Sequence, residues 1–253
     1  EAKDWGVPLI ENTLAETTLD PSRGIIFATG ENPSVLCRDV INHKTLFADT
    51  PPNNWRWFQR ASLLDEQGRF WSTDSSDSLY RFLSFDPKTL KFERHELSVP
   101  ENPYNHKRSN IRAYTERRAM DGAFWCISGN GAMFKFRPEK PAVELVGVNW
   151  DQGRYTSTIA MDSTGRYLYY MPGGMKMQNA NEYGPLVQYD TKTNQKKVLA
   201  WLVDYYYEKY GYWVGGTYGM EISADDSFLV IIMNGAFRIR DDLHDYPYET
   251  PSI

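Results

Sequence analysis

The sequence contains little cysteine and no long apolar run. Its two cysteines, Cys37 and Cys126, lie far apart without CxxC or CxxCH spacing, which excludes a zinc knuckle and a c-type haem site. Both lie in apolar stretches typical of strands, so we expect two buried free thiols. No run of about 18 apolar residues occurs, which excludes a membrane-spanning helix.

Positive charge is also scarce. The formal net charge is -5, with 28 Lys and Arg against 33 Asp and Glu. Nucleic acid binding requires a concentrated basic face, so this balance excludes nucleic acid as a partner. The first residues show no signal-peptide pattern. The composition is compatible with periplasm, cell surface or cytosol, and it slightly favours a periplasmic or extracellular location.

Apolar and aromatic side chains, in contrast, are plentiful. The chain is 41% apolar, which is enough for a sizeable core, and 15% aromatic. Flat aromatic side chains pack well across neighbouring strands and also suit a surface that faces carbohydrate.

A unit of apolar strand, tight turn and aromatic strand recurs along the chain. Its clearest copy runs from Asp65 through Gly68 to Trp71 and continues into a strand that ends at Asp86-Pro87-Lys88-Thr89. We take as register marks the turn aspartates Asp20, Asp65, Asp121, Asp162 and Asp225. They lie roughly 40 to 60 residues apart, close to the length of a propeller blade.

Each unit is a small antiparallel sheet that cannot bury both faces alone, so several units must stack around an axis. The sequence therefore predicts an all-β fold, a β-propeller of four-stranded antiparallel blades, as a single domain over residues 1–253. About five blades are recognisable, either as a ring closed through residues 1–14 or as part of a six- or seven-bladed ring. One short helix is predicted over residues 199–210, where apolar residues have helical spacing.

The blade units also carry a family resemblance. Asp65-x-x-Gly68-x-x-Trp71 and Asp121-Gly122-x-x-Trp125 resemble bacterial propellers of the gluconolactonase (SMP-30-like) and streptogramin B lyase-like superfamily. The segments Gly153-Arg154-Tyr155-Thr156 and Gly215-Gly216-Thr217-Tyr218-Gly219 look most similar to uncharacterised bacterial propeller proteins. The resemblance covers most of the chain and implies a bacterial propeller, with a fold that is more firmly indicated than any one activity.

The same resemblance implies a divalent cation, Ca, Mg, Mn or Zn, in the central channel. Gluconolactonase-type enzymes hold it partly with Asn and Asp residues that open later blades, whereas this chain has Thr158-Ile159 and Tyr218-Gly219-Met220 there, without a carboxamide. The four histidines form no HxH or HExxH motif, so the sequence leaves the metal ligands unknown.

Arginine and tyrosine concentrate just before the blade-opening strands, where chain segments converge on the axis. We predict catalytic roles for His106, Arg112, Tyr114 and Tyr155. We predict ligand contacts for Trp57, Arg60, Arg108, Arg154, Tyr212 and Tyr218. Arginine forks suit a carboxylate and tyrosine can stack on a sugar ring, so this level of the fold suits an anionic ligand. The alternative is that these basic residues belong to solvated loops and to ion pairs between blades.

These features favour a carbohydrate-active propeller that binds or cleaves an acidic sugar or sugar lactone at the channel mouth. As an enzyme it would be a polysaccharide lyase or a lactonase-like hydrolase, with Tyr114, His106 or Tyr155 transferring a proton. Its partner would be a small molecule or an oligosaccharide. The second hypothesis is a non-catalytic propeller, a ligand-binding or protein-interaction scaffold whose aromatic and arginine-rich rim contacts another protein chain.

Overall fold

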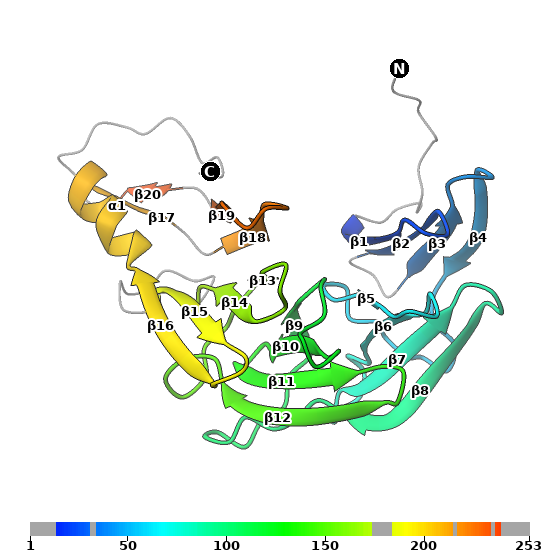
Figure 1. Ribbon diagram of the computed structural model, residues 1–253. Helices are drawn as coiled ribbons and strands as arrows, with labels where there is room; N and C mark the ends of the chain where they lie inside the picture. The colour runs from blue at the N-terminus through cyan, green and yellow to red at the C-terminus, as the bar shows by residue number, and fades with distance from the viewer. Residues whose placement is uncertain (1–13, 31–33, 174–183, 215–216, 234–235, 239–253) are drawn as a thin grey trace. The chain divides into compact units, whose positions relative to one another are not determined.

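The computed structural model describes residues 14–30, 34–173, 184–214, 217–233 and 236–238 (Figure 1). This part of the chain is antiparallel β-structure with one α-helix, as the sequence predicts. No helix in it is long and apolar enough to cross a membrane. The backbone groups into two compact units. The first unit comprises Glu1–Pro100, Arg108–Ile111 and Pro138–Val143, and the second comprises Glu101–Lys107, Arg112–Arg137 and Glu144–Ile253.

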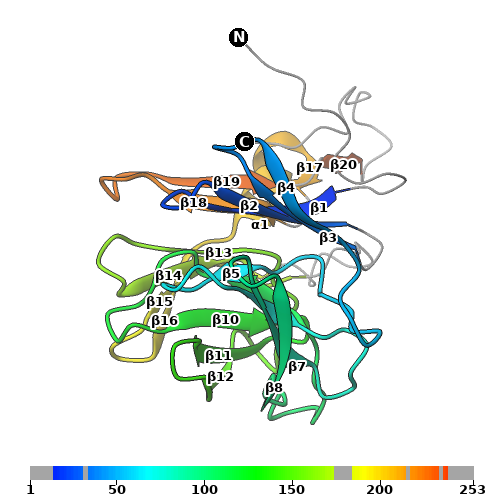
Figure 2. The same ribbon diagram turned by 90° about the vertical axis from the view of Figure 1, so that its right-hand side faces the viewer.

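Four sheets of four antiparallel strands follow one another along the chain, each with its strands in sequence order (Figures 1 and 2). The first sheet contains β1 (Leu14–Asp20), β2 (Ile25–Gly30), β3 (Val35–Asp39) and β4 (Lys44–Asp49). The second contains β5 (Leu63–Leu64), β6 (Phe70–Thr73), β7 (Arg81–Asp86) and β8 (Lys91–Ser98). The third contains β9 (Ile111–Tyr114), β10 (Phe124–Ser128), β11 (Ala132–Arg137) and β12 (Ala142–Val148). The fourth contains β13 (Ile159–Met161), β14 (Tyr167–Tyr170), β15 (Leu186–Asp190) and β16 (Gln195–Ala200).

Two shorter sheets and the helix complete the described chain. The helix α1 (Leu202–Tyr210) confirms the predicted one and ends at Gly211, which has a left-handed backbone. Two two-stranded sheets follow, β17 (Tyr212–Val214) with β20 (Ala236–Arg238) and β18 (Thr217–Ile222) with β19 (Leu229–Met233).

Burial differs systematically across the four-stranded sheets. The middle strands carry most of the buried side chains, as in β6 and β10, where every residue is buried. The fourth strands are largely exposed, namely β4, β8, β12 and β16. A sheet with two covered faces and one solvated outer edge strand has the organisation of a propeller blade. We therefore call the four sheets blades one to four, and β18–β19 the start of the fifth.

Aromatic stacking fills the core of the first unit. Phe27 stacks on Phe70 with ring centroids 4.8 Å apart, and Trp57 and Phe85 pack on the same side chain at 4.9 and 5.5 Å. All four are at most 3% exposed. The predicted buried thiol Cys37 belongs to this cluster and is free.

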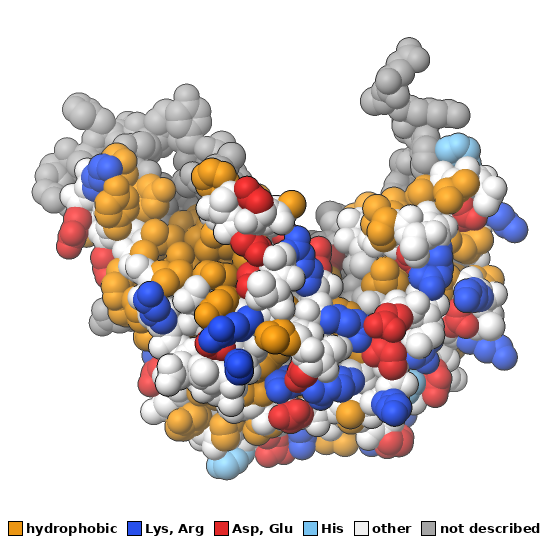
Figure 3. Space-filling view, viewed as in Figure 1, with side chains coloured by type: hydrophobic (Ala, Val, Ile, Leu, Met, Phe, Trp, Pro, Cys, Tyr) orange, Lys and Arg blue, Asp and Glu red, His pale blue; other side chains and the backbone are white. Residues whose placement is uncertain are grey.

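The second unit has its own core. Trp125, Tyr170 and Tyr189 pack with the aliphatic side chains of β13 and β15, and Cys126 on β10 is the other buried free thiol. A separate cluster joins α1 to β18 and β19. Figure 3 shows hydrophobic side chains gathered over α1, and three aromatic residues there are 42–49% exposed, namely Trp201, Tyr205 and Tyr210.

The structure corrects the register of the third blade. Its opening strand is β9, well before the predicted turn residue Asp121. The turn instead begins at Ala119, whose N–H donates to the Ala123 carbonyl at 2.9 Å. In the second blade, the Asp65 N–H donates to the Arg69 carbonyl in the same way, at 3.0 Å. Asp121, two residues after Ala119, is therefore not the counterpart of Asp65 that the sequence pattern predicted. The single domain and the final blade count stay predictions, because residues 1–13 and 239–253 lie outside the described chain.

Candidate functional site

Arg112 lies at the centre of the site that the second unit assembles. It is on β9, the opening strand of blade three, and Ile111 and Ala113 on either side are buried in alternation with it. The chain before β13 adds Tyr155 and Ser157, and β18 adds Thr217. These four residues come from the opening strands, or from the chain just before them, of three successive blade units. We call them the Arg112 cluster.

Neutral groups hold the Arg112 guanidinium. Its Nε donates to the Tyr155 hydroxyl, and its Nη1 donates to the Ser157 carbonyl at 3.0 Å. The guanidinium carbon also lies 5.1 Å from the centroid of the Tyr155 ring. The Ser157 side chain donates in turn to the Thr217 carbonyl. Nη2 of Arg112 makes no hydrogen bond to any residue that the structure describes.

The charge of Arg112 is therefore uncompensated within the described chain. The side chain is half-buried, and no described carboxylate forms an ion pair with it. Other arginines of this unit differ, since Arg166 pairs with Asp190 at 2.7 Å and Arg137 pairs with Asp121 at 2.8 Å. A partly desolvated cation that neutral groups orient is suited to receive an anion from outside.

The loop that carries Tyr155 is built around Asn149. This side chain is fully buried and donates to the Arg154 carbonyl and to the Thr156 hydroxyl, both at 2.6 Å. Its Oδ1 accepts from the N–H groups of Trp150 (2.8 Å) and Arg154 (2.9 Å). Three bonds to backbone groups and one to the Thr156 hydroxyl fix the path of the loop from residue 149 to residue 156.

A second buried asparagine and a glycine fix the other side of this loop. Asn102 donates to the carbonyls of Asn130 (2.7 Å) and Gln152 (2.9 Å). Gly153 has φ +103°, and a Cβ there would lie 2.2 Å from Nδ2 of Asn102. Only glycine fits this position, because a side chain would strain the backbone and displace the asparagine.

The other predicted catalytic residues are not joined to Arg112 by any contact among the described residues. Tyr114 is half-buried on the same face of β9, two residues further on. His106 is exposed and has φ +55°. It lies in a turn that is closed by a hydrogen bond from its own N–H to the Asn102 carbonyl. The two sit in one unit with Arg112, and their roles stay predictions.

The residues predicted to contact a ligand have varied surroundings. Arg154 is exposed and pairs with Asp151 at 3.0 Å. Tyr218 is 55% exposed on β18, whereas the side chain of Tyr212 on β17 lies outside the described residues.

Three more of these predicted contacts lie in the first unit. Trp57 is only 3% exposed and donates to Ser62 Oγ at 3.1 Å, so it serves the hydrophobic core rather than a ligand surface. Arg108 donates to the Val99 carbonyl at 2.7 Å, and Arg60 is half-buried.

The residues of the Arg112 cluster do not suit a divalent cation. Their oxygens are hydroxyls and carbonyls already engaged with one another, and the nearest charge is positive. Among the described residues, no three His, Cys, Asp or Glu side chains gather in a metal-binding arrangement. Glu221, on the same strand as Thr217, has a pKa raised above its ordinary value by partial burial and by the neighbouring charge of Glu116.

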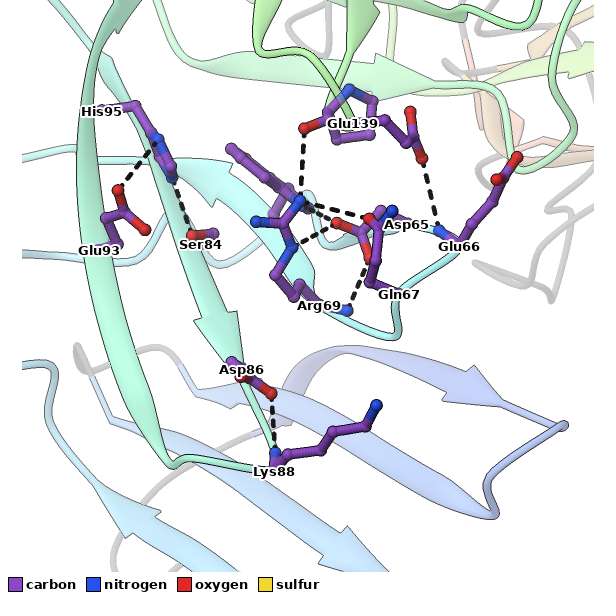
Figure 4. Close-up of polar contacts among 12 residues, drawn as sticks. Asp65, Glu66, Gln67, Arg69, Ser84, Asp86, Lys88, Glu93, His95 and Glu139 are labelled. Atoms are coloured by element: carbon purple, nitrogen blue, oxygen red, sulfur yellow. Dashed lines mark hydrogen bonds and ion pairs between the residues drawn. The ribbon is translucent and has the colours of Figure 1, made fainter.

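A Ser–His–acid sequence of contacts in blade two resembles a catalytic arrangement but is structural (Figure 4). Ser84 Oγ lies 2.9 Å from His95 Nε2, and His95 Nδ1 lies 3.8 Å from Glu93. Ser84 is only 3% exposed, so a substrate has no access to its hydroxyl. His95 stacks on Trp71 with centroids 4.5 Å apart, and burial lowers its pKa. Its neighbours along the chain, Arg94 and Glu96, are both charged, a pattern that is typical of a surface histidine instead.

Comparisons with known proteins support the fold. No protein-family model matches the sequence, and no curated protein matches it either. Many solved structures do match, at low identity. One is a catalytically inactive virginiamycin B lyase from Staphylococcus aureus with quinupristin, which is 13% identical with a TM-score of 0.61 and covers 92% of this chain and 73% of that one.

Two further matches have other functions. The extracellular domain of a putative one-component system from B. thetaiotaomicron is 13% identical (TM-score 0.54) over 90% of this chain and 26% of that one. The WD40 repeats of RRP9 are 10% identical (TM-score 0.54) over 76% of this chain and 52% of that one. The chain thus spans about half or less of these two. At such identities the likeness establishes the fold, so the predicted all-β propeller architecture is confirmed and the activity is not.

Proposed function

We propose that this chain is a ligand-binding propeller whose Arg112 cluster receives the carboxylate of an acidic sugar. One observation carries the proposal: Arg112 is half-buried and oriented by Tyr155 and Ser157, yet has no carboxylate partner in the described chain. A ligand carboxylate at Nη2 would compensate this charge with a charge-assisted hydrogen bond. Tyr114 and Tyr155 would supply aromatic surface beside it, which suits a sugar ring.

The same arrangement suits cleavage by elimination. Neutralising a uronate carboxylate acidifies the C–H next to it. A base then takes that proton, and the electron pair of the broken C–H bond forms a C=C bond with the neighbouring carbon. The C–O bond on that neighbouring carbon breaks, and the leaving oxygen gains a proton. The proton-transfer candidates are Tyr155, whose hydroxyl accepts from Arg112, and Tyr114, two residues along β9 from Arg112. The fold shared with virginiamycin B lyase is compatible with this reaction class.

Calorimetric titration with sodium glucuronate, with glucose as the uncharged control, tests the binding. We expect glucuronate to bind and glucose to bind much more weakly. Arg112→Ala should reduce glucuronate affinity by about 10- to 100-fold, the value of a hydrogen bond to a charged group. Arg154→Ala is the matched arginine control, from the loop that carries Tyr155, because its side chain is exposed and paired with Asp151, and it should bind normally.

Two results would overturn the proposal: equal affinity in Arg112→Ala and wild type, or no preference for glucuronate over glucose. Elimination has its own readout, the ultraviolet absorbance of the conjugated double bond formed from acidic polysaccharides. Absorbance that rises in wild type and stays flat in Tyr155→Phe would support catalysis, whereas identical rates in both would remove Tyr155 from the reaction.

A protein-interaction scaffold is the second candidate function. The observation that favours it is the exposed aromatic surface of α1, formed by Trp201, Tyr205 and Tyr210. Trp201 and Tyr205 also line an open pocket with Asp204 and Glu208, and the Lys209 ammonium lies 5.0 and 5.1 Å from the ring centroids of Tyr205 and Tyr210. This surface is therefore aromatic with charges of both signs, and it would suit a partner with apolar and charged side chains.

A further inference from the structure

The indole N–H of Trp125 has no hydrogen-bond partner. Trp125 lies on β10 and is fully buried, and Nε1 is one of the few buried polar side-chain atoms in the described residues without an acceptor. An indole nitrogen can only donate, and a buried donor without an acceptor destabilises the fold. The position of the Trp125 N–H therefore suits an oxygen that accepts its hydrogen bond.

The second blade shows what that oxygen is. There Trp71, at the matching place on β6, donates from Nε1 to Oδ2 of Asp65 at 2.8 Å. Arg69 donates to the same carboxylate at 2.8 Å, as Figure 4 shows. The tryptophan of blade two thus has a buried carboxylate as its partner.

The third blade has the same turn without the carboxylate. In blade two, Gly68 N–H bonds to the Asp65 carbonyl at 3.0 Å, and in blade three Gly122 N–H bonds to the Ala119 carbonyl at 2.8 Å. Trp71 and Trp125 each follow the first turn residue by the same number of positions. Ala119 therefore occupies the place of Asp65, and its methyl group leaves the acceptor position vacant.

A pocket adjoins this position within the second unit. Its volume is about 300 Å³, at the lower end for small-molecule sites, and its lining includes Ala119, Met120, Trp125, Lys135, Thr191 and Lys192. Met120 and Lys192 are exposed, so the pocket is open to solvent on their side.

The pocket offers more donors than acceptors. Lys135 Nζ lies 5.3 Å from the centroid of the Trp125 ring, and the ammonium of Lys192 adds a second positive charge. The only acid among the described lining residues is Asp121, which already accepts from Ala123 (3.1 Å), Lys135 (3.0 Å) and Arg137 (2.8 Å). Lys135 also pairs with Glu144 at 3.9 Å, whereas Lys192 forms no ion pair with a described residue. An occupant must therefore bring its own acceptors, and the ammonium of Lys192 is the positive charge left for it to compensate.

We propose that this pocket is a binding site for a small carboxylate, which takes the place that the Asp65 side chain has in blade two. The ligand carboxylate accepts from Trp125 Nε1 and lies near the ammonium groups of Lys135 and Lys192. The site uses none of the residues of the Arg112 cluster, so it stands or falls independently of the proposed function.

Nuclear magnetic resonance of the tryptophan indole N–H groups tests the site directly. Trp125→Phe identifies the resonance, and sodium acetate and sodium glucuronate are the probes, with sodium chloride and glucose as controls. We expect a saturable shift of the Trp125 indole resonance with both carboxylates and none with the controls. Trp125→Phe removes the reporter resonance, so its acetate affinity is measured by calorimetric titration, where we expect it to be about tenfold weaker than in wild type. Arg112→Ala should leave the shift unchanged.

A variant that supplies the missing carboxylate from the chain itself completes the test. Ala119→Asp with Ala123→Arg recreates the Asp65–Arg69 pair of blade two beside Trp125. In this variant the indole resonance should already have its shifted position and should no longer respond to acetate. An unresponsive resonance in wild type, or an equal response to chloride, would overturn the proposal, as would continued acetate binding in the double variant.

Discussion

At the residue scale, Asp65 shows how much one buried carboxylate can contribute. It is 3% exposed and accepts from Arg69 N, Arg69 Nε and Trp71 Nε1, each at 2.8 Å (Figure 4). Asp65→Ala would leave the buried indole N–H and the Arg69 cation without their acceptor. We expect the free energy of unfolding to fall by about 3–5 kcal/mol, as when one partner of a buried pair is removed.

Urea denaturation measures this loss. Asp49→Ala is the control, because Asp49 is exposed on β4 and accepts only from neighbouring Thr50, and it should cost less than about 1 kcal/mol. A similar loss in the two variants would show that the Asp65 pairings contribute little.

The residue scale is also where the sequence predicted least. His95 lies between two charged residues, which is typical of a surface position, but Trp71 covers one face of its ring. Trp57 stands beside arginines and indicated a ligand surface, but the core of the first unit encloses it. Neither outcome follows from neighbours along the chain, because both depend on side chains from other strands.

At the element scale, the loop between β12 and β13 depends on Asn149. Asn149→Ala removes both donors and the acceptor that this side chain supplies, leaving buried loop groups unsatisfied. We expect the free energy of unfolding to fall by about 2–4 kcal/mol. Glucuronate affinity should also fall, because Tyr155 and Ser157 would no longer be held against Arg112. Unfolding curves and calorimetry measure the two effects.

Asn105→Ala is the matched control for this loop. Asn105 is exposed and accepts only from Lys107 N–H at 3.0 Å, so the substitution should change neither stability nor affinity appreciably. If Asn149→Ala lost stability but bound glucuronate normally, the loop would have no part in positioning the Arg112 cluster.

Strands and turns were the most predictable elements. Alternating apolar residues bounded by Asp, Gly and Pro located the strands of the first two blades and of the fourth, because side-chain period and turn chemistry are local properties. The opening strand of blade three was missed because Asp121 imitates a turn aspartate while Ala119 starts the turn. Arg112 and Tyr155 were singled out by residue type. Ser157 and Asn149 were not, since their side chains bond mostly to backbone groups, and such contacts leave no sequence pattern.

At the scale of the whole molecule, the construction of the blades explains why proteins with this fold can have different functions. Each blade needs only buried middle strands, and many sequences satisfy this, so a lyase and a WD40 protein share the architecture at 13% and 10% identity. The chemistry instead depends on a few positions at the blade openings and turns. In blade three, one of those positions has Ala119 where blade two has Asp65, and this difference leaves the Trp125 indole N–H without the acceptor that Trp71 has.

The buried thiols and phenols control how the stability of the whole molecule changes at alkaline pH. Burial raises the pKa of the Cys37 thiol from 9.0 and that of the Tyr189 hydroxyl from 10.0, each to about 12, and it raises those of Cys126 and Tyr170 as well. In the unfolded chain these groups lose their protons at lower pH than in the folded one. The unfolded state therefore binds fewer protons above pH 9, and stability must fall as pH rises.

We expect the urea midpoint to begin falling near pH 9 and to keep falling towards pH 12 as the pKa values of the folded thiol and phenol are approached. Cys37→Ala removes one of these groups, so its midpoint should start lower but fall less steeply over this range. His43→Ala changes an exposed residue and should keep the wild-type slope. A midpoint that stayed constant or rose between pH 9 and 12, or an equal slope in Cys37→Ala, would mean that these groups ionise as readily in the folded chain as in the unfolded one.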